Sequence, residues 1–320
     1  MKKRIAVLAG GLTGEDVISH RSATMVMNHI DRDKYEPWKV VFDSRGKYAE
    51  TEKGPVSVDL NDFSFIVEGE KITFDKVFVM IHGDPGENGR VQGYFDLIGL
   101  PYTTGGVLAM SLTAGKFYLN AFLRERGFRC AKSLLVRKGS NTVTEEIVKE
   151  LGLPVFVKPN NGGSSLATSR CDHKDQIASA LEKAMAMDPE VIIESFLPGT
   201  EVTSGVIMQN GKPLALPLTE ILSDNSFFDF EAKYEGASKE ITPARVSEDI
   251  TRKIQDLSTG VYQLLDCHGM IRVDYIIVQD EPYLVEVNTV PGFSEASIIP
   301  QQAAAIGISK KDLITLVLES

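Results

Sequence analysis

The first hundred residues alternate between short, continuous apolar runs and polar segments that contain glycine. Runs of this length, rich in Val, Ile and Phe, predict buried strands at residues 5–9, 38–42 and 76–81. A helix is predicted between the first two strands, with Ser19 or Ser22 as its N-cap and Ile30 as its last residue. This order predicts an open, mostly parallel α/β sheet, in which ligands bind at the carboxyl ends of the strands.

The middle of the chain has the pattern of a smaller α+β unit. After a break rich in glycine at residues 99–106, a helix that contains Lys116 is predicted to reach Arg126. Strands at residues 131–136, 155–158 and 191–195 surround a helix at residues 174–187. Further strands follow, and the last predicted helix begins at about Lys310.

The clearest strand pair lies near the C-terminus, at residues 271–278 and 282–288, and predicts a hairpin with its loop at residues 279–281. Centring this hairpin on Asp280 places Asp274 opposite Glu286 and Arg272 opposite Asn288. Because side chains alternate between faces, these four lie on one face at one end. The other face is predicted to be apolar and to carry Val273, Tyr275, Ile277, Tyr283, Val285 and Val287.

Two carboxylates and an amide therefore converge beside one arginine. They could form an ion-pair network that only stabilises the sheet. However, a single arginine leaves a net negative charge, and buried carboxylates require a partner, so a bound cation fits better. The three candidate ligands Asp274, Glu286 and Asn288 offer hard oxygens, which suit Mg²⁺ or Mn²⁺ and not zinc.

Composition narrows the class of protein. A chain of 320 residues is long enough for two or three domains, and 43% hydrophobic with 24% charged residues is typical of a soluble globular protein. The net charge of −10 and the pI near 5.1 disfavour nucleic acid or an anionic membrane as a partner. Three widely spaced cysteines and a first apolar run too short for a signal peptide predict a cytoplasmic protein with free thiols.

A second candidate for chemistry is the segment 158–165, in which Lys158 at a strand end precedes a loop of glycine, asparagine and serine. Such a loop can close its N–H groups on phosphate oxygens, although it lacks the order of a P-loop and could be a surface turn. A phosphate loop together with a distant cation site predicts nucleotide phosphoryl chemistry. The turn at Gly10 and Gly11 matches a dinucleotide fingerprint poorly, so nicotinamide or flavin binding is not expected.

Over essentially its full length the chain resembles the D-alanine–D-alanine ligase family of the ATP-grasp superfamily. The matching blocks, in family order, are Gly10-Gly11-x-x-x-Glu15-x-x-Ile18-Ser19, His82-Gly83-x-x-Gly86-Glu87-Asn88-Gly89-x-x-Gln92-Gly93, Pro101-Tyr102-Thr103, Lys158-Pro159 through Gly163-Ser164-Ser165, Glu231-Ala232-Lys233-Tyr234, Arg272-x-Asp274 and Glu286-x-Asn288-x-x-Pro291-Gly292. The resemblance implies an N-terminal α/β substrate-binding domain at residues 1–101. Two α+β ATP-grasp subdomains that clamp ATP follow at residues 102–190 and 191–320, the second carrying the metal site.

The resemblance also implies roles for individual residues. The implied catalytic residues are Glu15, Ser164, Tyr234, Arg272 and Gly292. The implied D-alanine-binding residues are His82 and Ser297. The implied ATP-binding residues are Lys116, Lys158, Glu194, Leu197, Glu201 and Lys233. The implied metal ligands, for two ions, are Asp274, Glu286 and Asn288. A homodimer is also implied, with D-alanine and ATP as the small-molecule substrates.

The chain departs from the family pattern in three places. Gly115 stands where Asp usually precedes Lys116, Asn88 replaces an acid in the second block, and the phosphate loop has Gly162 and Leu166-Ala167 at unusual positions. Rival functions are a D-alanine–D-lactate or D-alanine–D-serine ligase, another ATP-dependent carboxylate–amine ligase, and a non-catalytic nucleotide-binding protein. Tyr234 argues against the lactate enzyme, and the retained metal ligands and Arg272 argue against a non-catalytic protein.

Overall fold

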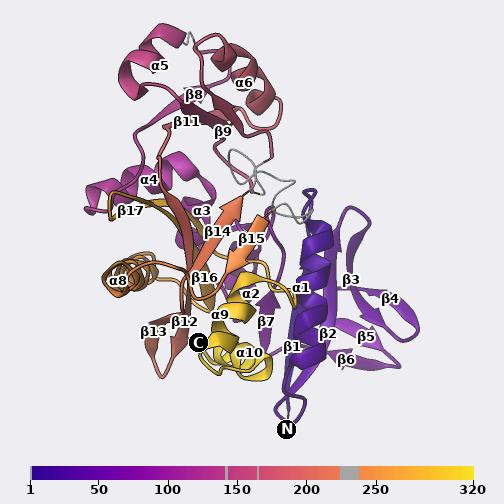
Figure 1. Ribbon diagram of the computed structural model, residues 1–320. Helices are drawn as coiled ribbons and strands as arrows, with labels where there is room; N and C mark the ends of the chain where they lie inside the picture. Colours follow the sequence, from indigo (N-terminus) through magenta and orange to yellow (C-terminus); the bar gives the residue numbers. More distant parts are fainter. Residues whose placement is uncertain (1, 141–142, 164–165, 224–237) are drawn as a thin grey trace.

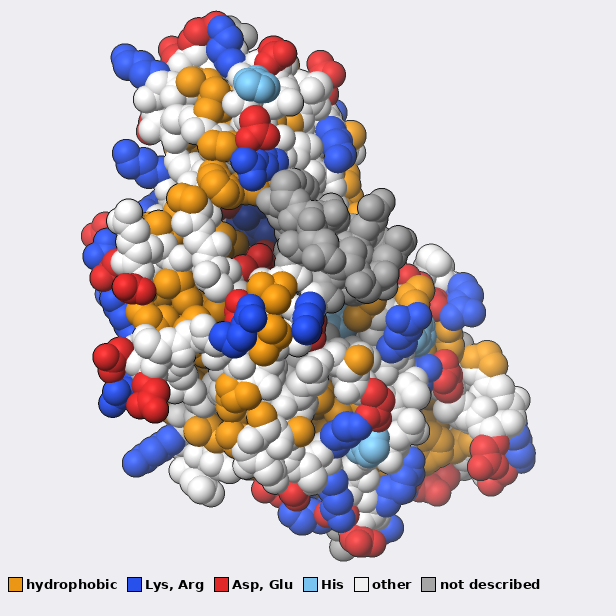
Figure 2. Space-filling view, in the orientation of Figure 1, with side chains coloured by type: hydrophobic (Ala, Val, Ile, Leu, Met, Phe, Trp, Pro, Cys, Tyr) orange, Lys and Arg blue, Asp and Glu red, His pale blue; other side chains and the backbone are white. Residues whose placement is uncertain are grey.

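The computed structural model describes residues 2–140, 143–163, 166–223 and 238–320 of the chain. These residues form sheets of five, four and six strands, and a two-stranded ribbon of β5 (Phe65–Val67) and β6 (Glu70–Ile72). In Figure 1 the four-stranded sheet and its helices lie at one end, the six-stranded sheet in the middle, and the five-stranded sheet with α1 at the other side. On the face seen in Figure 2, acidic and basic side chains are interspersed.

The first sheet has a parallel centre and an antiparallel edge. Its strands are β1 (Lys3–Gly10), β2 (Tyr35–Asp43), β3 (Gly46–Thr51), β4 (Gly54–Ser57) and β7 (Lys76–Val79), in the order β4-β3-β2-β1-β7. β1 pairs in parallel with both β2 and β7, as predicted from the strand–helix–strand pattern. Tight returns after β2 and β3 add two antiparallel strands that the apolar pattern did not predict.

Helix α1 (Asp16–His29) begins before the predicted serine caps, so that prediction is wrong. Ser19 and Ser22 lie inside the helix and are fully buried. The hydroxyl of Ser19 accepts from the N–H of Gly10 at 2.9 Å and donates to the carbonyl oxygen of Met80 at 2.7 Å. The hydroxyl of Ser22 lies 3.1 Å from Nε2 of His82. Both serines thus use their hydroxyls for contacts with other segments and not for capping.

The core beneath the first sheet is completed from the far end of the chain. Helix α10 (Lys310–Glu319) contributes Leu313, Ile314, Val317 and Leu318 to the cluster that also contains the apolar residues of β1 and α1. Lys76 on β7 donates to the carbonyl oxygen of Leu318 at 2.8 Å. Helix α9 (Ile298–Ala305) packs between this core and the six-stranded sheet (Figure 1).

Helices α2 (Arg90–Ile98), α3 (Val107–Ala114) and α4 (Lys116–Glu125) connect the first sheet to the second. The second sheet has the order β10-β9-β11-β8 and consists of β8 (Ser133–Arg137), β9 (Val155–Pro159), β10 (Ser169–Cys171) and β11 (Glu190–Ser195). Helices α5 (Thr144–Leu151) and α6 (Gln176–Met185) contribute apolar residues to its separate core. Because β11 belongs to this sheet, the chain leaves it only at Ser195; the domain boundaries stay predictions.

The third sheet has the order β15-β14-β12-β16-β17, with β13 beside β12. Its strands are β12 (Thr200–Gln209), β13 (Lys212–Ala215), β14 (Thr219–Ser223), β15 (Ser238–Ile241), β16 (Met270–Val278) and β17 (Glu281–Asn288). Helix α8 (Glu248–Leu264) packs on one face, and its N-cap Ser247 accepts from the N–H of Ile250. The three cysteines are buried and free.

The β16–β17 hairpin has the predicted register only at its polar end. Asp274 pairs with Glu286 and Arg272 with Asn288, as predicted, but Tyr275 pairs with Leu284, so Val285 is an extra residue in a β-bulge. The loop is consequently two residues long, at Gln279 and Asp280, both with positive φ, and not three.

The bulge also changes which side chains face the core. Leu284 is buried beside Tyr275, whereas Tyr283 and Val285 are only half-buried. The predicted placement of Tyr283 and Val285 on the apolar face is therefore wrong.

Candidate active site

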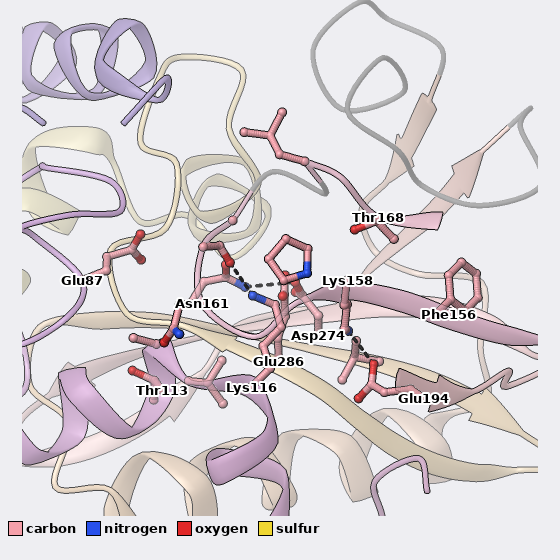
Figure 3. A pocket seen from close by; sticks show the side chains of 18 of the residues that line it. Glu87, Thr113, Lys116, Phe156, Lys158, Asn161, Thr168, Glu194, Asp274 and Glu286 are labelled. Carbon is pink, nitrogen blue, oxygen red and sulfur yellow. Dashed lines mark hydrogen bonds and ion pairs between the residues drawn. The ribbon is translucent and has the colours of Figure 1, made fainter. Parts of the chain in front are cut away.

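A cavity of about 1200 Å³ lies where the three sheets meet. Its walls come from the loops after β1 and β7, from α3 and α4, from β9 and β11 and the loops that follow them, and from β12, β14, β16 and β17. In Figure 3 the labelled side chains follow one another across the cavity. Phe156, Lys158 and Glu194 lie at one end, Lys116, Asp274 and Glu286 in the middle, and Glu87 at the other end.

At the first end, Lys158 on β9 and Glu194 on the neighbouring strand β11 form a buried ion pair, with 2.5 Å between Nζ and Oε2. Asn120 of α4 donates to the other oxygen of Glu194 at 2.9 Å. Burial acts to lower the pKa of Lys158, but Glu194, then Glu286 and Glu201, outweigh burial and raise it. Lys158 therefore places a positive charge in the cavity wall, where it could attract the oxygens of a phosphate.

Lys116 is the first residue of α4, and its ammonium donates to the carbonyl oxygen of Gly162 in the loop after β9. The backbone N–H of Lys116 donates to the carbonyl oxygen of Asn160 at 3.0 Å. Both lysines predicted to bind phosphate therefore border the same loop and line the cavity. Leu197 and Glu201, also predicted for ATP, lie in its wall.

The polar end of the hairpin is tightly connected in this structure. Arg272 donates to both oxygens of Asp274 at 2.9 Å each. Thr203 of β12 donates to Oδ1 of Asp274 at 2.5 Å, and the Asn288 amide donates to Oδ2 at 3.0 Å. The ion pair between Arg272 and Asp274, which the sequence left open as an alternative, is thus present, and it fixes the plane of the guanidinium.

Three of these side chains match a site for a hard cation. Asp274, Glu286 and Asn288 all line the cavity, and Glu286 lies directly across the hairpin from Asp274. Their oxygens suit Mg²⁺ or Mn²⁺. The Asn288 amide donates to Asp274 through Nδ2, so its Oδ1 is the atom that could bind a cation. Within the described residues, no cluster of three or more His, Cys, Asp and Glu could hold a metal, so this set depends on the asparagine.

His82, which follows β7, is buried and precedes Gly83, a residue of the cavity wall. Its Nδ1 lies 2.7 Å from the carbonyl oxygen of Val290, so Nδ1 carries the proton. Its Nε2 lies 3.1 Å from Oγ of Ser22, which in turn accepts from the N–H of Phe293. Burial lowers the pKa of His82 to about 4, so the ring is neutral and links β7 to the loop at residues 290–293.

Glu87 lines the cavity, although its place in the sequence predicts no role for it. Its two oxygens accept from the N–H groups of Gly83 at 2.7 Å and Val290 at 3.0 Å. Burial, followed by the nearby charge of Glu15, raises the pKa of Glu87 to about 7. The signal was available, because Glu87 stands in the same block as His82, but an acid in a loop gives no reason by itself to expect burial.

Glu15 is buried at the start of α1, between two loops. A Cβ atom built on Gly83 would lie 2.9 Å from one oxygen of its carboxylate, and one built on Gly163 would lie 2.9 Å from the other. Glycine at both positions thus lets the two loops approach this carboxylate. Gly292 and Ser297 lie in the loop after Val290, where the Ser297 hydroxyl accepts from the N–H of Ser294 at 2.8 Å.

Nine of the predicted residues line the cavity: Glu15, Lys116, Lys158, Glu194, Leu197, Glu201, Asp274, Glu286 and Asn288. Four lie outside its lining: His82, Arg272, Gly292 and Ser297. Ser164, Lys233 and Tyr234 lie outside the described residues.

Comparison with known protein families shows to which family the chain belongs. Residues 4–105 match the family described as D-ala D-ala ligase N-terminus, and residues 125–319 match D-ala D-ala ligase C-terminus. The chain belongs to the D-alanine–D-alanine ligase family. The D-alanine–D-alanine ligase of Bacteroides fragilis is 46% identical to it over 322 residues, which cover 100% of this chain and 99% of the relative. That of Flavobacterium johnsoniae is 46% identical over 318 residues, 99% and 98% of the two chains.

Solved structures give the same result for the fold. VanG D-Ala:D-Ser ligase from Enterococcus faecalis matches with a TM-score of 0.90 and 28% identity, covering 100% of this chain and 99% of that one. The Bacillus anthracis D-alanine–D-alanine ligase complexed with ATP matches with a TM-score of 0.79 and 27% identity, covering 99% and 96%. The predicted ATP-grasp fold, with an α/β part followed by two α+β parts, is confirmed.

Departures from the D-alanine–D-alanine ligase pattern have clear local effects. Asn88 donates from its amide to Asp84 at 2.6 Å, a contact that an ionised acid at position 88 could not make. Gly162 has a φ of 104°, a backbone conformation that residues with a side chain rarely adopt, and its carbonyl oxygen accepts from Lys116.

In the part of the chain that the structure describes, no helix is long and apolar enough to cross a membrane.

Proposed function

We propose that this protein joins two molecules of D-alanine to D-alanyl-D-alanine, converting ATP to ADP and phosphate, in the synthesis of peptidoglycan precursors. One observation carries the proposal: in a member of this ligase family, the cavity orders its groups as nucleotide base, phosphates and amino acid would require. Phe156, Lys158 and Glu194 lie at one end, and Lys116 and the hairpin oxygens lie in the middle. Glu87 lies at the other end, and Glu15 lines the cavity from the loop after β1.

At the nucleotide end, Glu194, Leu197 and Glu201 would bind the adenine and ribose, beside the ring of Phe156. Lys158 and Lys116 would neutralise phosphate charge, and the raised pKa of Lys158 supports this role. Asp274, Glu286 and Asn288 would hold two Mg²⁺ or Mn²⁺ ions. These ions would supply charge neutralisation for the phosphate oxygens during transfer.

At the amino-acid end, Glu15 would pair with the ammonium group of the first D-alanine, and Ser297 would bind the carboxylate of the second. A carboxylate oxygen of the first D-alanine attacks the γ-phosphorus, the bond to ADP breaks, and an acyl phosphate forms. The amine of the second D-alanine then attacks the acyl carbon. Arg272 and the N–H of Gly292 would stabilise the oxyanion of the tetrahedral intermediate, from which phosphate leaves.

His82 supports this end through position and not through charge. A neutral ring bonded to Val290 holds the loop that carries Gly292 against β7. Ser164, Lys233 and Tyr234, predicted to close over the site, complete the proposal from outside the described residues. Closure matters because an acyl phosphate reacts readily with water.

The test is ATP-dependent phosphate release with Mg²⁺ and D-alanine, with the dipeptide product identified by mass spectrometry. We expect D-alanine to stimulate release and L-alanine to leave it at the basal rate. The proposal fails if D-alanine gives no stimulation while another amino acid does. Glu286→Gln is the matched variant for the metal site, and near-normal turnover in it would contradict that assignment.

A second candidate is a D-alanine–D-serine ligase, favoured by the TM-score of 0.90 with VanG. Identity separates the two: 28% with VanG against 46% with relatives named D-alanine–D-alanine ligase. Equimolar D-alanine and D-serine offered together with ATP distinguish them. We expect D-alanyl-D-alanine as the main product, and a predominance of D-alanyl-D-serine would favour the second candidate. A homodimer and a cytoplasmic location remain part of the proposal.

A further inference from the structure

Helix α4 starts without a capping side chain of its own. Its N-cap residue is Gly115, with φ −93° and ψ 95°, and the helix begins at Lys116. The first N–H groups of a helix have no partner within it, and an Asp, Asn or Ser side chain at the N-cap usually accepts from one of them. Gly115 therefore leaves the first turn, including Lys116, to be fixed by something else.

Asn160, in the loop after β9, supplies what Gly115 lacks. Its carbonyl oxygen accepts from the N–H of Lys116 at 3.0 Å, and its side-chain Oδ1 accepts from the N–H of Phe117 at 2.8 Å. Phe117 is the second helical residue, one of the two positions that an N-cap side chain normally serves. Asn160 is completely buried, so water does not compete for these bonds.

The other side of Asn160 is fixed to the second sheet. Its Nδ2 donates to Oε2 of Glu190 at 3.1 Å, and its backbone N–H donates to the Glu190 carbonyl oxygen at 2.9 Å. Oε1 of Glu190 accepts from Tyr118 at 2.7 Å and from Arg137 at 2.9 Å. The hydrogen bond from Tyr118, followed by that from Arg137, lowers the pKa of Glu190. The amide orientation of Asn160 follows, because an ionised carboxylate only accepts and a backbone N–H only donates.

Glycine at position 115 fits this arrangement. A Cβ atom there would lie 2.8 Å from Cδ2 of Tyr118 and 3.7 Å from Nδ2 of Asn160. A capping side chain at position 115 would therefore compete for space with Tyr118 and Asn160. The small residue at 115 and the amide at 160 thus act together, and the cap of α4 comes from the loop after β9.

We propose that Asn160 is a positioning residue that sets the distance between the two phosphate-binding lysines. It stands two residues after Lys158 on the chain and bonds directly to the backbone of Lys116. A lysine side chain is flexible, so the position of its backbone limits the region that its ammonium group can reach. This inference rests on the proposed function of Lys116 and Lys158 in ATP binding.

The experiment measures KM for ATP, KM for D-alanine, and the Kd of ADP by calorimetry in Asn160→Ala. We expect KM for ATP and Kd for ADP to rise about tenfold, equivalent to about 1.4 kcal/mol and the size of one helix cap, with KM for D-alanine changed less than about twofold. The double variant Asn160→Asp/Glu190→Gln exchanges donor and acceptor across their contact, keeps an acceptor for Phe117, and should recover most of the ATP affinity. Glu190→Gln alone is its control.

Ser309→Ala is the matched control for a merely structural role. It removes the cap of α10, whose Ser309 hydroxyl accepts from the N–H of Asp312 at 3.1 Å, far from the cavity. It should lower Tm without changing KM for ATP. The inference is overturned if Asn160→Ala raises both KM values equally, if it lowers only Tm, or if the folded double variant binds ADP no better than Asn160→Ala.

Asn160→Leu, which keeps the size of the side chain but has no acceptor for the N–H of Phe117, serves if the alanine variant does not fold, and unchanged ATP and ADP affinity in it would equally refute the inference. Failure of the proposed function is distinguishable, because it would abolish D-alanine-dependent turnover in the unsubstituted protein. The calorimetric comparison of ADP binding would still decide the role of Asn160.

Discussion

Protonation of His82 offers the sharpest test of how the site is held together. The ring donates from Nδ1 to Val290, and its Nε2 accepts from Ser22, whose hydroxyl is oriented by the N–H of Phe293. A second proton on Nε2 would remove the acceptor that Ser22 uses. Burial, the first cause, lowers the pKa of His82 from 6.5 to about 4.

The direction of the pH effect on stability follows from the linkage between proton binding and folding. The proton binds more strongly to the unfolded chain, so stability is complete above pH 6.5 and is lost as the pH falls towards 4. With these two pKa values, lowering the pH from about 7.5 to about 5 removes roughly 2 kcal/mol of the free energy of unfolding through this residue. The full change of the pKa from 6.5 to about 4 corresponds to about 3.4 kcal/mol.

The perturbation is His82→Gln, which keeps an amide donor and an acceptor but cannot titrate. Urea unfolding at both pH values, followed through the single tryptophan, Trp38 on β2, reports on the sheet that carries His82. At pH 7.5 we expect the variant to be less stable than the unsubstituted protein. At pH 5 the gap should narrow by about 2 kcal/mol, because only the unsubstituted protein loses stability at this residue. A gap that stays constant within about 0.5 kcal/mol would refute the assignment of a buried, neutral ring.

Three further predictions concern the cavity and its frame. Glu286→Gln should reduce kcat on the order of 100-fold with little change in Tm, measured by phosphate release at several Mg²⁺ concentrations; unchanged kcat contradicts the metal assignment. Lys158→Ala should lower the free energy of unfolding by about 3–5 kcal/mol, because Glu194 is left buried without its cation. The double variant Lys158→Met/Glu194→Gln should regain most of that stability but no activity. Equal Tm values for Lys158→Ala and the double variant would contradict the stabilising role of the ion pair. Gly86→Ala should give little soluble protein, since its Cβ would lie 2.0 Å from the carbonyl oxygen five residues earlier, whereas Gly93→Ala, with a contact of 3.6 Å, should fold normally.

The polar face of the hairpin could be predicted because period-two alternation is a local property. Register at Asp274 and Glu286 followed from it and is confirmed. The bulge at Val285 could not be predicted, because its cause is not local. Leu284 is drawn into the core beneath Tyr275 and must change face relative to Glu286, which a single extra residue permits.

Two other differences between the predictions from sequence and the structure also arise from contacts between distant segments. Ser19 and Ser22 match the preference for helix caps, but buried donors and acceptors on distant segments claim their hydroxyls. Glu87 resembles an ordinary loop acid, and only the folded chain shows that two N–H groups converge on it. The identity of the site residues could be read from motifs, whereas the bonds that orient them depend on contacts between distant parts of the chain.

The contribution of α10 to the first core has a consequence for synthesis in the cell. The ribosome completes β7 at residue 79 but α10 only at residue 319, and the core of β1 and α1 is closed by Leu313, Ile314, Val317 and Leu318. At about 5–20 residues per second, the apolar face of the nascent sheet waits roughly 12 to 48 seconds for its cover. Each newly made chain therefore passes through a period in which that face is open to chaperones or to a neighbouring nascent chain.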